Sequence, residues 1–246
     1  MNISILTAVY NEQHIIDTIT SWINYLESSD FIDKFEIVIC DDHSDVEYFE
    51  NLKKSLTGNR KVVLLRNQKN EGPGYSFSRC IQSARFDYSL ITDSDGQFPI
   101  ENLDKILELY KQYGNNKLIV FTHRDKKYDN FINIFGQRIS NFLCNFIYKT
   151  SLNDFTSAFK FVPTLLLKKV SFDARYMNYS LDHTAKLIET KQEFIDESIT
   201  CEEKEPRKRG LFKEIVRARD RCLYIHHLWY RCFLLKRKVL FHHHDE

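Results

Sequence analysis

The sequence has no long apolar run, no paired cysteine motif and almost no net charge. Because no 18 consecutive uncharged apolar residues occur, no transmembrane helix is expected. Met1 leads directly into a strand-like run with no signal-peptide cleavage site, so the chain is predicted to be cytoplasmic. The six cysteines are scattered and form no C-x-x-C pair, which favours reduced thiols over a disulfide framework or a zinc knuckle.

The sequence does contain enough apolar residues for a core. Of its 246 residues, 43% are hydrophobic, and this composition argues against an intrinsically disordered chain. No internal repeat or low-complexity linker interrupts it. We therefore expect one compact domain over residues 1–210, followed by a terminal helix and tail over 211–246.

The net charge of +1 hides an uneven distribution along the chain. Residues 206–241 carry eleven Lys and Arg but only two acids, Glu214 and Asp220, which gives +9. Residues 242–246 contribute −2, so the first 205 residues carry about −6. Nucleic acid is not expected as a partner, because the negative charge of the first 205 residues would oppose its binding.

Hydrophobic spacing in the first 120 residues alternates between the strand and helix periods. Apolar runs predict strands at 3–9, 35–40, 61–65, 88–92 and 118–121. Helical spacing predicts helices at 12–26, 46–56, 75–84 and 100–113. This alternation predicts an α/β fold with a mostly parallel sheet flanked by helices, whose ligands bind at the carboxyl ends of the strands.

The second half is less regular. Spacing predicts helices at 131–148, 164–170 and 179–189, and strands at 157–161 and 194–199. After a basic loop, one long amphipathic helix is expected over 211–240. Three interpretations of this helix stay open: it docks on its own domain, it forms a homodimer, or residues 211–241 contact an anionic membrane surface.

The sharpest motif is the stretch from Asp93 to Gln97, directly after the strand at 88–92 and before a helix. Two carboxylates at positions i and i+2, Asp93 and Asp95, can both approach one divalent cation. Mg²⁺ prefers such oxygen ligands and usually shares them with phosphates, and Gln97 can add a carbonyl oxygen. The competing interpretation is a polar loop whose acids stabilise the start of the next helix.

Three further polar motifs follow predicted strands. They are Tyr10-Asn11-Glu12, the acidic stretch at 40–45 that contains Asp41 and Asp42, and the turn at 70–74. A carboxylate at 40–45 can accept a hydrogen bond from a base or a ribose, and a helix start beside glycine exposes backbone N–H groups to a ligand. Each motif alone also fits capping or a turn, but all four fall on one edge of the predicted sheet.

In this order the motifs resemble glycosyltransferase family 2, a family of nucleotide-sugar-dependent enzymes with the GT-A fold. The resemblance is closest to its polyprenyl-phosphate branch, which includes dolichol-phosphate-mannose synthase. The family's Pro-x-Tyr-Asn-Glu motif resembles residues 8–12, with Ala8 in place of Pro. Its Asp-Asp-x-Ser, Asn-x-Gly and Asp-x-Asp-x-Gln motifs resemble residues 41–44, 70–72 and 93–97.

The resemblance continues past the nucleotide half and covers about residues 3–213. Arg124 after a strand and Arg138 in a helix resemble arginines of this branch. Residues 153–160 resemble its Asp-x-Thr-Ser-Gly-Phe-Arg stretch, with Ala158 for Gly and Lys160 for Arg. Residues 207–213 resemble its Arg-x-x-Gly-x-Ser-Lys stretch, with Phe212 for Ser.

The resemblance implies a role for each matched residue. Asp93, Asp95 and Gln97 would hold Mg²⁺ or Mn²⁺, with Asp95 central to catalysis. The acceptor would meet Asp154, Thr156 and Ser157. The residues implied to bind the donor, or a phosphate of donor or acceptor, are Ala8, Tyr10, Glu12, Asp42, Asn70, Gly72, Asp93, Ser94, Arg124, Arg138, Arg207 and Lys213.

The implied chemistry is direct displacement at the anomeric carbon with inversion. The leaving diphosphate gains negative charge, which a metal and Arg or Lys side chains would stabilise. A sugar hydroxyl acceptor needs a general base, and Asp182 lies roughly where sugar-acceptor members carry their catalytic Asp. A lipid phosphate is already anionic and needs no base, and Asp182 would then be an exposed helix residue.

The predicted activity is metal-dependent transfer of a sugar from a nucleotide-sugar to a polyprenyl phosphate or a growing surface glycan. One alternative is a sugar nucleotidyltransferase, which also needs a metal-bound nucleotide on an α/β sheet. The other is a non-catalytic GT-A scaffold at a membrane. The joint presence of Asp93, Asp95 and Gln97 argues against the scaffold.

Overall fold

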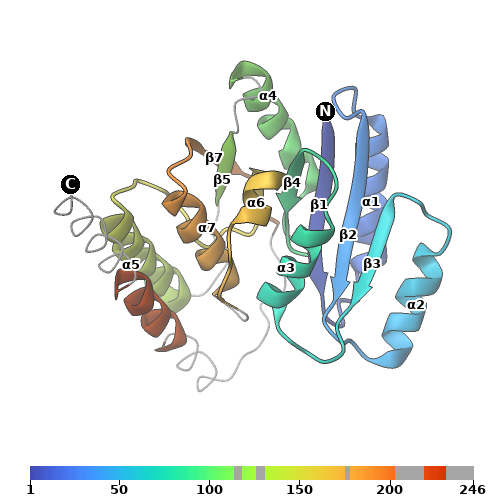
Figure 1. Cartoon of the computed structure of the whole chain (residues 1–246), viewed down its shortest axis with the longest axis horizontal. Coiled ribbons are helices and arrows are strands. Elements are labelled where there is room, and N and C mark those ends of the chain that lie inside the picture. Colours follow the sequence, from blue (N-terminus) through green and yellow to red (C-terminus); the bar gives the residue numbers. More distant parts are fainter. Residues whose placement is uncertain (114–117, 126–130, 175–177, 203–218, 231–246) are drawn as a thin grey trace, which may run out of the picture. The chain divides into compact units, whose positions relative to one another are not determined.

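The computed structural model describes residues 1–113, 118–125, 131–174, 178–202 and 219–230 (Figure 1). The chain divides into two compact units. Unit 1 comprises Met1–Tyr128 and Thr156–Lys204, and unit 2 comprises Asp129–Phe155 and Glu205–Glu246. The boundary predicted at residue 210 lies outside the described residues, so the division into 1–210 and 211–246 stays a prediction.

Unit 1 is built on one seven-stranded sheet with the order β3-β2-β1-β4-β6-β5-β7. The strands are β1 (Asn2–Val9), β2 (Lys34–Asp41), β3 (Val62–Arg66), β4 (Tyr88–Ile91), β5 (Ile119–Arg124), β6 (Lys160–Pro163) and β7 (Phe194–Ile199). The first four are parallel, β5 is parallel to β7, and β6 is antiparallel to both its neighbours. The prediction of a mostly parallel α/β sheet is confirmed.

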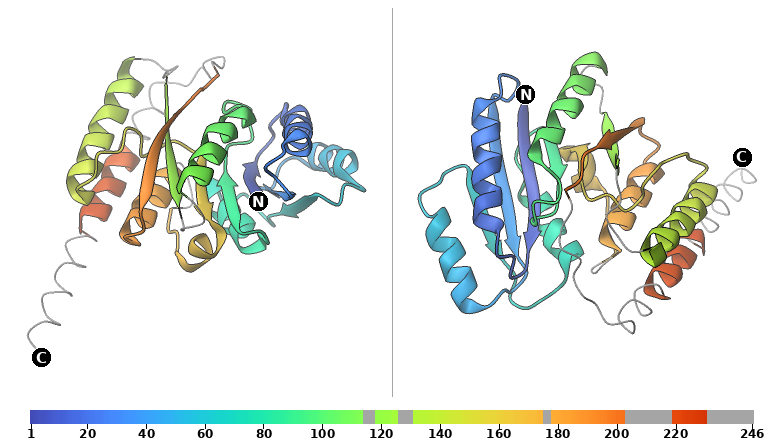
Figure 2. Two further views of the ribbon diagram at one scale, coloured as in Figure 1. Left: turned by 90° about the horizontal axis from the view of Figure 1, so that it is seen from above. Right: turned by 180° about the vertical axis from the view of Figure 1, so that it is seen from behind.

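Helices cover both faces of this sheet (Figures 1 and 2). One face carries α1 (Ile15–Ser28) and α4 (Leu103–Tyr113), which follows the short 3₁₀ helix η1 (Ile100–Asn102). The other face carries α3 (Pro73–Ser83), α6 (Thr164–Lys169) and α7 (Tyr179–Glu189). The helix α2 (Val46–Leu56) connects β2 to β3.

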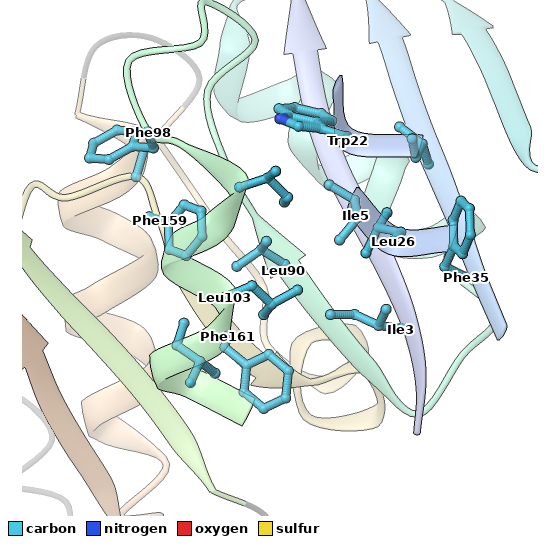
Figure 3. Close-up of a cluster of buried hydrophobic side chains, with 14 of the residues drawn as sticks. Ile3, Ile5, Trp22, Leu26, Phe35, Leu90, Phe98, Leu103, Phe159 and Phe161 are labelled. Atoms are coloured by element: carbon cyan, nitrogen blue, oxygen red, sulfur yellow. The ribbon is translucent and has the colours of Figure 1, made fainter. Parts of the chain in front are cut away.

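The main core lies between the sheet and the helices α1 and α4 (Figure 3). Alternate residues of β1, Ile3 and Ile5, meet Trp22 and Leu26 of α1, and all four side chains are buried. Burying an aliphatic or aromatic side chain of this kind contributes about 1.5–3 kcal/mol. This packing fixes which strands are neighbours, and so which loops meet at the carboxyl edge.

Some element ends differ from the predicted ends for local reasons. The helix α1 starts at Ile15 rather than Glu12, because residues 13–14 form a turn and His14, with φ −95° and ψ 10°, is the N-cap. The helix α3 starts earlier than predicted, at Pro73, whose fixed φ suits a first helical position. The strand β6 starts at Lys160 rather than Ser157, because the Ser157 carbonyl accepts hydrogen bonds from side chains instead of a strand neighbour.

Unit 2 contains the helix α5 (Phe131–Tyr148), at its predicted bounds, and a helix at residues 219–230. Two asparagines of α5 hold the following loop. Asn141 Nδ2 donates to the Leu152 carbonyl at 2.8 Å, and Asn145 Oδ1 accepts from Leu152 N at 2.9 Å. The rest of the helix predicted over 211–240 lies outside the described residues.

Among the helices in the described part of the chain, none has the length and apolar character needed to cross a membrane.

Candidate functional site

Three polar segments meet at the carboxyl edge of the sheet in unit 1. The strands β2, β1 and β4 are consecutive neighbours and parallel, so their carboxyl ends lie side by side. Asp42 follows β2, Tyr10 follows β1, and Asp93 follows β4. The fold therefore brings together the predicted motifs, although they are far apart in the sequence.

The carboxylate of Asp42 joins its own loop to the turn at 70–72. Asp42 is buried, and its Oδ2 accepts from Gly72 N at 2.8 Å. Its Oδ1 accepts from Glu71 N at 2.9 Å and from Asn67 Nδ2 at 2.7 Å. Gly72 has a φ of 88°, which a residue with a side chain rarely adopts. The motifs at 40–45 and 70–74 thus form one hydrogen-bonded structure.

Asn67 is a residue of this structure that the sequence motifs missed. It is buried, and its Nδ2 also donates to Ser76 Oγ at 2.8 Å. Its Oδ1 accepts from Arg79 Nη1 at 2.8 Å. Asn67 directly follows β3, so its place after a predicted strand was the signal available in the sequence.

The segment after β1 is held at the edge by its backbone and by the Asn11 side chain. Asn11 N donates to Ser44 Oγ at 2.9 Å, and Asn11 Oδ1 accepts from Asp45 N at 3.0 Å. The Glu12 carbonyl accepts from Tyr48 Oη at 2.8 Å. These bonds tie the Tyr10 to Glu12 segment to the Asp42 loop and leave the Tyr10 side chain exposed.

The Asp93 and Asp95 carboxylates form the acidic centre of the edge. Asp93 accepts a hydrogen bond from the Tyr179 hydroxyl. Burial and then the nearby charge of Asp95 raise the pKa of Asp93 to about 6, against the opposing effects of Tyr179, Lys160 and Arg124. Asp95 Oδ1 accepts from Gln97 N at 3.0 Å.

Tyr179 and Lys160 support this centre and were not predicted as site residues. Burial and the Asp93 charge raise the pKa of Tyr179 well above its usual value, so the phenol stays protonated and donates. Lys160 lies opposite Ile91 in the sheet and is buried. Its Nζ donates to the Ser157 carbonyl and, at 2.6 Å, to Ser180 Oγ. A cation is thus fixed close enough to Asp93 to lower its pKa.

Two of the residues predicted to meet the acceptor, Thr156 and Ser157, contact β5. Arg124 Nη2 donates to Thr156 Oγ1 at 3.4 Å, which links the end of β5 to the segment before β6. Ser157 is buried and shares a 2.8 Å hydrogen bond with Thr122 Oγ1. Asp154 is buried and Arg138 is exposed, and both belong to unit 2. Arg207 and Lys213 lie outside the described residues.

Asp182 is buried in α7, so the interpretation of an exposed helix residue is wrong. Its Oδ2 accepts from the backbone N–H groups of Asp173, at 2.7 Å, and Ala174, at 3.0 Å. Its Oδ1 lies 3.4 Å from Lys186 Nζ. These contacts hold the 171–174 loop and favour a structural role, while the assignment of Asp182 as a base stays a prediction.

The carboxylate pair suits a divalent cation. Two close carboxylates, one with a raised pKa, hold excess negative charge that a cation would offset. Within the described ranges, no group of three or more His, Cys, Asp or Glu side chains gathers as a complete metal site. A cation at this edge would therefore take further ligands from Gln97 or from substrate phosphates, as Mg²⁺ commonly does.

The family model for glycosyl transferase family 2 matches residues 4–171, more than half of the chain. No curated protein matches the chain.

Solved structures share the fold at low sequence identity. Glucosyl-3-phosphoglycerate synthase from Mycobacterium tuberculosis, in complex with Mn²⁺, UDP and phosphoglyceric acid, gives a TM-score of 0.68 at 14% identity, over 93% of this chain and 78% of that chain. S. aureus TarS 1–349 gives 0.54 at 20% identity, over 83% of this chain and 59% of that chain. These likenesses show the α/β fold of GT-A type.

Proposed function

Because the chain belongs to glycosyl transferase family 2, we propose that it transfers a sugar from a nucleotide-sugar to a polyprenyl phosphate or a growing surface glycan. One observation carries the proposal: Asp42 and the Asp93 and Asp95 pair lie on one edge of a parallel sheet. Such edges bind nucleotides in α/β folds. The Mn²⁺ and UDP named with the mycobacterial synthase agree with this assignment.

The nucleoside end of the donor lies at the Asp42 structure. Here a carboxylate is already positioned by Asn67 and by the turn at 70–72, so it can accept from a base or ribose without reorganising. Ala8, Tyr10, Glu12, Asn70 and Gly72 complete this half of the donor site. In this donor site Asn67 orients Asp42.

The diphosphate of the donor lies at the Asp93 and Asp95 pair. These two carboxylates and Gln97 would hold Mg²⁺ or Mn²⁺, which supplies positive charge to offset the charge gained by the leaving diphosphate. The hydroxyl of Tyr179 orients Asp93. Arg124 and the fixed cation of Lys160 are close enough to Asp93 to lower its pKa, and Ser94 lies between the two carboxylates in sequence.

The acceptor decides which other residues take part. A polyprenyl phosphate would be bound through its charge by Arg138, Arg207 and Lys213 and would need no base. Asp154, Thr156 and Ser157 are the other residues proposed to bind the acceptor. A glycan hydroxyl would need one, and Asp182 is the proposed residue. The polyprenyl-phosphate branch is favoured by the motif order, and its reaction proceeds with inversion.

The basic segment 211–241 has two proposed contacts beyond the catalytic unit. A contact with an anionic membrane surface would keep a cytoplasmic enzyme near a lipid-linked acceptor. A homodimer through the same segment is the second. At residues 219–230, Ile225 and Leu228 are buried, which supports docking of this part within its own chain.

The Asp42→Ala variant tests the donor site. We expect it to weaken binding of the preferred donor by about 10- to 100-fold, as for loss of a hydrogen bond to a charged group. The measurement is calorimetry with UDP-, GDP- and dTDP-sugars in the presence of Mn²⁺. Glu47→Ala, which removes an exposed acid from the neighbouring helix, should bind like the wild type. Equal affinity of the folded Asp42→Ala variant and the wild type would contradict the assignment.

A further inference from the structure

One side of the helix α5 in unit 2 is apolar and exposed to solvent. Phe135, Ile139, Phe142, Leu143 and Phe146 are all exposed, and Phe142 and Phe146 are 70% and 73% exposed. Their spacing of three or four residues places them on one side of the helix. Contiguous exposed apolar surface of this kind marks a contact site, since isolated exposed apolar residues show no such periodicity.

The second helix of unit 2 adds to this apolar surface. Residues 219–230 lie beside α5 in all the views (Figures 1 and 2). Leu223, Trp229 and Tyr230 of this helix are each at least half exposed. Unit 2 thus contributes eight of the fifteen large apolar side chains that are exposed in the described part of the chain.

The charge around this surface has one predominant sign. Residues 130–153 contain no Asp or Glu, and their two charged residues, Arg138 and Lys149, are exposed. In the second described helix of unit 2, residues 219–230, Arg219 and Arg221 stand against one acid, Asp220. The partner that complements this surface is therefore both anionic and apolar.

We propose that the exposed face of α5 docks on an anionic lipid surface. Lipid headgroups supply the negative charge, and the acyl boundary accepts the phenylalanine side chains. A second copy of the chain fits less well, because it would bring the basic residues Arg138 and Lys149 of two copies together. This proposal extends the membrane contact from the terminal segment to α5 and holds whichever sugar or acceptor the enzyme uses.

Vesicle sedimentation with the full chain tests this docking. The wild type should sediment with phosphatidylglycerol-containing vesicles and much less with phosphatidylcholine alone. The double variant Phe142→Ser/Phe146→Ser should bind the anionic vesicles at least about tenfold more weakly, because two exposed aromatic anchors are lost. The matched control is Leu165→Ser, which removes a side chain of unit 1 that is 73% exposed and should bind like the wild type.

Two results would overturn the docking proposal. The first is wild-type sedimentation no greater with anionic vesicles than with neutral ones. The second is equal sedimentation of the wild type and the double variant, whose folding is checked by circular dichroism. A dimer in light scattering that the same two substitutions dissociate, without vesicle binding, would assign the face to a second copy. Donor turnover is measured in parallel and should be unchanged in the double variant, which separates this proposal from the catalytic one.

Discussion

The Asp95→Ala variant should lose sugar transfer by about a thousandfold or more, while remaining folded. Asp95 is one of the two carboxylates at the end of β4, and its charge is close enough to Asp93 to raise the pKa of that residue. Without Asp95 the site has one carboxylate to hold a divalent cation. The charge that develops on the leaving diphosphate would then be stabilised far less.

The fold should survive this substitution, because the charges of Asp93 and Asp95 repel each other in the absence of a cation. The melting temperature of Asp95→Ala should therefore equal or exceed that of the wild type when no metal is added. Asp17→Ala, which removes an exposed acid from α1, serves as the control and should keep full activity. Undiminished turnover by Asp95→Ala would eliminate the metal assignment.

The buried His183 should make the free energy of unfolding depend strongly on pH. His183 is buried among the rings of Phe77, Phe172 and Tyr179, and neither ring nitrogen has a hydrogen-bond partner. Burial, and then the charges of Lys160 and Lys186, lower the pKa of His183 well below its usual value. The folded protein therefore keeps this imidazole neutral in mild acid.

Because the pKa of His183 is lowered in the folded state, the protein should become less stable as the pH falls. Below pH 6.5 the unfolded chain binds a proton at this histidine and the folded chain does not, so stability falls as pH falls. Where the unfolded chain is fully protonated at this histidine and the folded chain is not, the loss approaches about 1.4 kcal/mol per pH unit. Asp93, with its pKa raised to about 6, acts in the opposite direction over part of this range.

The His183→Leu variant isolates this contribution, since Asp93 is present in both proteins. Its free energy of unfolding, from urea titrations at several pH values, should decline less steeply than that of the wild type below pH 6.5. The exposed His14 provides the control, and His14→Leu should follow the wild-type curve. Parallel curves for His183→Leu and the wild type would mean that His183 is protonated in the folded state.

The hydrophobic periods predicted the helices α2, α5 and α7 and the strand β7 with their observed bounds. Local spacing suffices in α2 and α5, because their apolar residues recur every three or four positions. The common location of the polar motifs could also be predicted, because the carboxyl ends of parallel strands lie at the same edge of a sheet. Local pattern could not reveal that β6 runs antiparallel between β4 and β5, because strand direction depends on contacts distant in sequence.

The buried polar residues were the main omission. Lys160 lies in a stretch rich in apolar residues, and nothing nearby in sequence shows that it reaches Ser180 and influences Asp93. Tyr179 looked like the first residue of an ordinary amphipathic helix, yet it donates to Asp93 across 86 residues of sequence. Such roles depend on tertiary contacts, so single-sequence spacing does not predict them.

The proposed reaction cleaves a nucleotide-sugar between the sugar and the diphosphate. The most direct measurement is product analysis after incubation with Mn²⁺ and a panel of nucleotide-sugars, alongside nucleoside triphosphates with sugar phosphates. We predict release of a nucleoside diphosphate from at least one nucleotide-sugar, lost in Asp95→Ala. Release of pyrophosphate from a nucleoside triphosphate, with no diphosphate from any nucleotide-sugar, would contradict the claim and assign nucleotidyl transfer instead.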